Sequence, residues 1–250
     1  MARSLRRVGA IVLAVMAAAL AAACSGGSSP PTPAPSVQSP VGSSGGSSGV
    51  PPSAVSSGPG AVAAAINLTA ADMPGFTGTP HQVSAADRRN SDRLARCAGG
   101  TPPSAALADV YSPDFSKGNG TLLVDSDVTV MPSTSDVARD VASLRSGRAE
   151  SCFRRLIGQE LAQQLGGVKV SGLRVDRISS PAPGTDAAFG FRITLTITRA
   201  GQSTPLFSDL RGFAVGNVEV SLTTFGTGQP FPESDALRLF SLLVQRAGSR

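Results

Sequence analysis

The stretch AFGFRITLTITR, residues 188–199, decides the fold class. Every second residue from Phe189 to Ile197 is apolar, and the residues between are glycine, arginine and threonine. Alternation with a period of two is the pattern of a β-strand with one face in the core. We expect a strand with these residues on its core face: Phe189, Phe191, Ile193, Leu195 and Ile197.

The neighbouring segments predict more strands of the same antiparallel kind. They span residues 168–179, 205–215 and 218–225, and an earlier strand spans 121–131. Ala200-Gly201 and Gly216-Asn217 are suited to tight turns between consecutive strands. Ser171-Gly172 predicts a bulge in the strand that contains it.

Helical patterns lie before, between and after these strands, at residues 84–97, 135–147, 150–167 and 232–247. Ser84 followed three residues later by Asp87 is typical of a helix N-terminus. The sequence therefore predicts an α+β fold, an antiparallel sheet of about five or six strands with helices packed on it. We expect one domain over residues 62–250.

The N-terminus predicts export. Arg3, Arg6 and Arg7 precede an apolar run at residues 8–20, which is the pattern of a signal peptide over residues 1–23. The small residues before Cys24 resemble the lipobox of bacterial lipoproteins, which implies that Cys24 is acylated and holds the chain at the outer face of the cytoplasmic membrane. The alternative is a secreted protein in which Cys24 is incidental.

Residues 24–61 predict a disordered tether. Between Ser25 and Gly60 there are 12 Ser, 8 Gly and 8 Pro and no charged residue, so this segment cannot bury enough apolar surface to fold. Removal of the signal peptide leaves 19 basic and 17 acidic residues. This balance gives no basis for expecting a nucleic acid partner.

Cys97 and Cys152 are the two cysteines of the folded part. An oxidising exterior makes a disulfide between them the expected state. The alternative, a reactive thiol, needs an activating base, and His81 is the single histidine of the chain.

The sequence shows no combination of residues that predicts a catalytic or metal-binding site. His81 lies in a Gly- and Pro-flanked turn and is interpreted as an ordinary surface residue, and no metal ligands or cofactor are expected. Asp125 and Asp127 share one strand face, where we interpret them as solvated, although a carboxylate pair could act in catalysis. Arg145, Arg148, Arg154 and Arg155 are a candidate anion patch, with a solvated helix surface as the alternative.

The order RCAGG, VTVMPSTSDVARDVASLRSGRAESC, LRGFAVGNVEVSLTTFG and a closing amphipathic helix resembles the extracellular sensor domain of mycobacterial receptor kinases of the PknH type. The resemblance implies an actinobacterial sensor-like domain with helices on an antiparallel sheet, a family-type disulfide at Cys97 and Cys152, and a cleft for a ligand, and it supplies no catalytic residue. We expect the ligand to be a small molecule, lipid or glycan, and no enzymatic activity. This chain lacks the cysteines for the second disulfide of that family, and it has no kinase segment. The alternative is an interaction lipoprotein that docks on an envelope membrane protein, and an envelope hydrolase is a third hypothesis.

Overall fold

The computed structural model describes residues 58–164 and 169–249. The predicted signal peptide and the acylation site Cys24 lie outside the described residues, as does the tether up to residue 57. The first helix of the described residues, α2 (Pro59–Ile66), starts three residues before the predicted domain boundary at residue 62. Its Ala63 and Ile66 are buried, so the folded part of the chain includes them.

The sheet is antiparallel, as predicted, but it has eight strands rather than five or six. In chain order they are β1 (Thr77–Thr79), β2 (Ala108–Tyr111), β3 (Asp114–Lys117), β4 (Leu122–Val130), β5 (Lys169–Arg177), β6 (Ala187–Arg199), β7 (Gln202–Val215) and β8 (Val218–Thr227). The spatial order is β1-β3-β4-β8-β7-β6-β5, and β2 pairs with β4. The three extra strands, β1 to β3, have only three or four residues each, which is too short for a periodic pattern.

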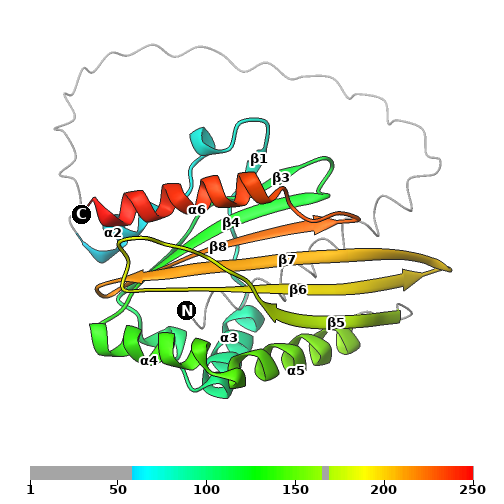
Figure 1. Cartoon of the computed structure of the whole chain (residues 1–250), viewed down its shortest axis with the longest axis horizontal. Coiled ribbons are helices and arrows are strands. Elements are labelled where there is room, and N and C mark those ends of the chain that lie inside the picture. The colour runs from blue at the N-terminus through cyan, green and yellow to red at the C-terminus, as the bar shows by residue number, and fades with distance from the viewer. Residues whose placement is uncertain (1–57, 165–168, 250) are drawn as a thin grey trace, which may run out of the picture.

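Helices cover both faces of the sheet (Figure 1). On one face lie α3 (Ala85–Ala98), α4 (Thr134–Arg145) and α5 (Gly147–Gln164), and on the other lie α6 (Glu233–Gly248) and α2. Two short 3-10 helices, Ala70–Asp72 and Pro103–Ala105, belong to the connections. The sheet therefore separates two hydrophobic cores.

The core face predicted for residues 188–199 is confirmed. Phe189, Phe191, Ile193 and Leu195 are buried beneath the α3–α5 layer, and Ile197 packs against the same cluster. Phe153 of α5 meets Phe191 with ring centroids 5.2 Å apart. Packing against aromatic residues of this size supplies much of the free energy that holds the helical layer on the sheet.

The predicted helix cap, strand bulge and hairpin turn are also present. Ser84 and Asp87 form a capping box at the start of α3, and the pairing of β5 with β6 shifts register between Ser171 and Arg174. Val215 pairs with Val218 across Gly216-Asn217, which closes the hairpin of β7 and β8. No helix within residues 58–164 and 169–249 is long and apolar enough to cross a bilayer.

Near the C-terminus, α6 is fastened to the first part of the domain by a pair between Arg246 and Asp72. Arg246 Nη2 lies 2.8 Å from Asp72 Oδ1, and Nη1 also donates to the Asn67 carbonyl. Burial alone would raise the pKa of Asp72, but hydrogen bonds from Arg246 and Thr69 outweigh it and lower this pKa.

This pair predicts a loss of stability in acid. A lowered folded-state pKa stabilises the fold above the unfolded-state value near 3.8, and that contribution disappears as the pH falls through the folded-state value. Asp72→Asn should therefore cost about 2 kcal/mol at pH 6, and the difference from wild type should shrink as the pH falls below 3.8 toward the lowered folded-state pKa. Urea unfolding from pH 6 to pH 2.5 measures it. Asp235→Asn is the control, because Asp235 and Arg238 form an exposed pair on α6; an equal loss in this control would contradict the prediction.

Candidate functional site

A cavity of about 860 Å³ lies between α4 and the sheet, lined by Ala187 at the start of β6 and Ala214 near the end of β7. Figure 1 shows α4 at the same end of the sheet as the start of β6 and the end of β7. Its walls are mainly apolar, formed by Val137, Ala138, Val141, Ala142, Ala187 and Ala214. Thr134, Ser135, Ser146 and Gly216 add small polar or glycine surfaces. The volume is in the range of small-molecule sites in proteins.

Small side chains account for this cavity. Ala187 and Ala214 are partners in adjacent strands, so two methyl groups stand side by side on the sheet. Ala138 and Ala142 are one helical turn apart on α4 and line the same space. Because none of these four side chains reaches far, a gap remains where larger residues would bring α4 into contact with the strands.

The cavity has two charged lining residues, Arg145 and Asp186. The exposed Asp186 carboxylate accepts a hydrogen bond of 2.7 Å from the Gly216 amide, which orients it without removing its negative charge from the cavity wall. Arg145 is exposed and makes no ion pair among the residues that the structure describes. The site therefore offers an apolar wall with one available guanidinium.

Arg177 of β5 fixes the end of α4 that carries Arg145. Its Nη2 lies within 3.1 Å of three carbonyl oxygens, those of Leu144, Arg145 and Ser146. Its Nε donates to Glu150 at the start of α5. A cation at these carbonyls satisfies groups that the helix itself leaves without donors, so one side chain sets the geometry of the α4–α5 junction.

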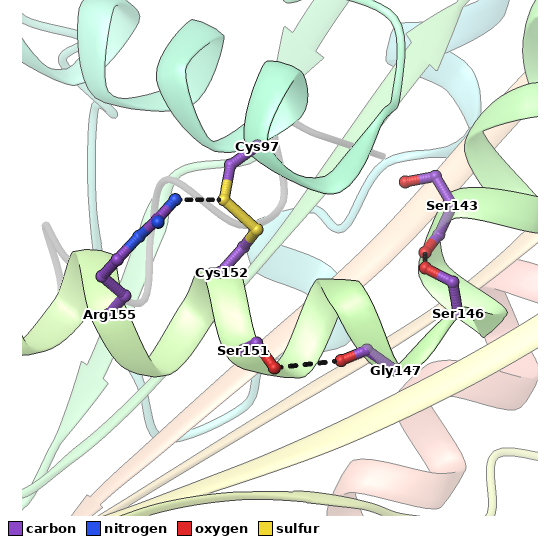
Figure 2. The surroundings of a disulfide bond; sticks show 7 residues. All are labelled: Cys97, Ser143, Ser146, Gly147, Ser151, Cys152 and Arg155. Atoms are coloured by element: carbon purple, nitrogen blue, oxygen red, sulfur yellow. Dashed lines mark hydrogen bonds between the residues drawn. A yellow bond between two sulfur atoms is a disulfide. The ribbon is translucent and has the colours of Figure 1, made fainter.

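The predicted disulfide is present between Cys97 of α3 and Cys152 of α5. Figure 2 shows it joining the two helices, with the Arg155 guanidinium pointing toward Cys97. Arg155 Nη2 lies 2.8 Å from Cys97 Sγ. Both cysteines are therefore used in the cross-link, which excludes the reactive-thiol interpretation for the described state.

The structure distributes the four arginines of the predicted anion patch over two helices. The backbone leaves the helical conformation at Ser146, so Arg145 ends α4 while the other three belong to α5. Arg148 and Arg155 line a second hollow next to the disulfide. Arg145 lines the α4 cavity instead, and Arg154 lines neither.

The interpretation of Asp125 and Asp127 as solvated residues is wrong. They are only 1% and 3% exposed, because their face of β4 is the face that α3–α5 cover. Cross-strand pairing places polar residues around them: Thr223 opposite Asp125, and Ser221 opposite Asp127. The result is a buried polar region on the β4–β8 half of the sheet, next to the aromatic core under β6.

His81 is also less exposed than expected for a surface residue, with 14% of its side chain accessible. Its Nδ1 lies 2.8 Å from an Asp114 oxygen, and its ring stacks on Tyr111 with centroids 4.7 Å apart. These contacts tie the loop before α3 to β2 and β3. Within residues 58–164 and 169–249, no group of three His, Cys, Asp or Glu is placed to hold a metal ion.

Comparisons with known proteins find similar solved structures. The extracellular domain of PknH from Mycobacterium tuberculosis is 15% identical over 75% of this chain and 95% of that chain, with a TM-score of 0.36. An uncharacterised Mycobacterium smegmatis protein, the Rv0999 ortholog, is 13% identical over 70% of this chain and 90% of that chain, also with a TM-score of 0.36. No family model and no curated protein matches the chain. At these TM-scores, neither likeness decides the fold or the function.

Proposed function

We propose that this protein is a lipid-anchored, extracytoplasmic binding protein without catalytic activity, and that the α4 cavity holds its ligand. The cavity is the observation that carries the proposal, because it combines an apolar wall with one available guanidinium. The signal sequence, the lipobox-like Cys24 and the tether support a place at the outer face of the cell membrane. A sensor-like role agrees with the sequence resemblance to receptor kinase sensor domains.

The lining of the cavity indicates the chemistry of the ligand. Alanine and valine side chains offer no hydrogen bonds, so the part of the ligand that contacts them is expected to be apolar. Arg145 favours a carboxylate or phosphate at one end of the ligand. An amphipathic anion with a hydrocarbon chain meets both conditions, and oleate is a convenient probe.

Filling the cavity should abolish binding. Ala142→Phe places a ring in the cavity from an exposed helix position, and we expect oleate affinity to fall at least about tenfold. Arg145→Gln should weaken oleate about fivefold and leave oleyl alcohol, which has the same chain without the charge, unaffected. Displacement of a fluorescent ligand from the full chain in detergent measures the affinities for oleate and for oleyl alcohol.

The matched control is Ala86→Phe, which makes the same substitution at an exposed position on α3 away from the cavity. It should bind oleate like wild type. Equal affinity in wild type and Ala142→Phe would contradict a ligand site at α4. Hydrolysis of cell-wall fragments that is lost in Asp125→Asn would instead make the protein an enzyme.

One observation favours the alternative, an interaction lipoprotein that docks on an envelope membrane protein. β5 is an edge strand of the sheet, and most of its residues are exposed. The edge of such a strand can pair with a strand of another protein. Crosslinking in cells from a photoreactive residue at Lys169 separates the two functions: a specific protein adduct supports docking.

A further inference from the structure

A second hollow, of about 360 Å³, lies beside the disulfide. It is lined by Arg148, Ser151, Cys152 and Arg155 of α5 and by Cys97 of α3. Figure 2 shows the disulfide, Ser151 and the Arg155 side chain on the α5 segment concerned. Residues 148, 151, 152 and 155 are spaced by three or four, so their side chains share one face of α5. The Ser151 hydroxyl on this face donates a hydrogen bond to the Gly147 carbonyl oxygen.

The two guanidiniums retain most of their hydrogen-bonding capacity. Among the described residues, neither Arg148 nor Arg155 forms an ion pair, and Arg155 donates a hydrogen bond to Cys97 Sγ. A disulfide sulfur is a weak acceptor, and each guanidinium has five N–H donors. Two adjacent cations without a carboxylate create a local positive potential that favours an anion.

The C-terminus of α3 explains part of this arrangement. Gly99 caps the C-terminus of α3. A Cβ atom at this position would lie 3.9 Å from Arg148 Nη1. Arg148 therefore lies near the negative end of that helix dipole, which a cation stabilises. A helix end carries only about half an elementary charge, so a net positive potential remains in a hollow lined by two full charges.

We propose that this hollow binds a phosphate group, with Arg148 and Arg155 as the two donors of charge-assisted hydrogen bonds and Ser151 as a polar neighbour. Planar guanidinium groups match two oxygens of a phosphate at once. The disulfide contributes by holding α3 against α5, so that Cys97 closes one wall. The site is separate from the α4 cavity and does not depend on the function proposed for it.

The test uses the full chain in detergent, oxidised, titrated calorimetrically with inorganic phosphate. Each of Arg148→Gln and Arg155→Gln should reduce the affinity about tenfold. Arg154→Gln is the matched control, because it removes the same charge from the same helix outside the hollow, and it should bind like wild type. Arg155→Lys keeps the charge but loses the planar geometry and should give an intermediate affinity.

Vesicles distinguish the source of the phosphate. If a lipid headgroup is bound, the chain should cosediment with phosphatidylglycerol vesicles more than with phosphatidylcholine vesicles, and Arg148→Gln with Arg155→Gln should remove the difference that Arg154→Gln retains. If free phosphate is bound, the losses of phosphate affinity remain, and all three substitutions have the same effect on cosedimentation with the vesicles.

The proposal would be overturned if the chain bound no phosphate and preferred neither kind of vesicle. It would also be overturned if Arg154→Gln lost as much affinity as the other two substitutions. Variants that melt at lower temperature but bind phosphate like wild type would overturn it too, because the arginines would then serve only the α3 terminus.

Discussion

Replacing Cys97 and Cys152 together by serine is expected to lower the free energy of unfolding by about 4 kcal/mol. The bond joins residues 55 positions apart in sequence and so restricts the unfolded chain strongly, since the entropy of loop closure grows with loop length. In the native state it connects α3 to α5, two helices that also pack against each other and contribute Leu94 and Phe153 to the same core. These contacts remain in the double variant, so we expect a folded but much less stable domain.

Guanidinium chloride unfolding of the oxidised wild type and of the double variant gives the difference. Cys24→Ser is the matched control, because it makes the same chemical change at the cysteine that lies outside the described residues, and it should leave the unfolding midpoint unchanged. A loss below about 1 kcal/mol in the double variant would mean that the cross-link hardly restricts the unfolded chain.

The second large effect is expected at Arg211, whose side chain is buried between the sheet and α6. Arg211 is 1% exposed. Its Nη2 lies 2.6 Å from Glu233 Oε1, and its Nη1 lies 2.8 Å from the Ser179 carbonyl oxygen. One side chain therefore joins the start of α6, β7 and the segment after β5.

Arg192 completes the cluster. Its Nε lies 2.7 Å from Asp209 Oδ1, and this hydrogen bond is the main reason why the pKa of Arg192 is raised. Asp209 Oδ2 also lies 3.5 Å from Arg211 Nη2, so two arginines and two carboxylates form one network of ion pairs. A buried member of such a cluster cannot be removed without leaving its partners short of compensation.

Arg211→Met should therefore cost about 3 kcal/mol, near the lower end for a broken buried ion pair, since Asp209 keeps Arg192 and Glu233 is partly hydrated. Urea unfolding at pH 7 measures this loss. Arg238→Met, on the exposed surface of α6 with its pair to Asp235, is the control and should change stability by no more than about 0.5 kcal/mol. If the two variants lost equal stability, burial of the cluster would not be the source of the effect.

The strands and helices with regular patterns could be predicted because their signals are local. Alternation over residues 188–199, the Ser84 cap and the Gly216-Asn217 turn each depend on a few neighbouring residues, and each is found in the structure. β1, β2 and β3 were missed because each has only three or four residues, too few for a periodic pattern, and each is held by pairing with another strand. α2 was missed because its small residues resemble those of the predicted tether.

The candidate sites depended on arrangement in space. The sequence alone determined the alternating faces of the strands, the two cysteines available for a cross-link and the charged residues available to a ligand. Only the tertiary structure decided that Asp125 and Asp127 are covered, because alternation separates the two faces of a strand but does not say which face another layer will cover. It likewise decided that Arg145 points to one hollow while Arg148 and Arg155 line another, since the break at Ser146 and the packing of α3 on α5 set the direction of each helix.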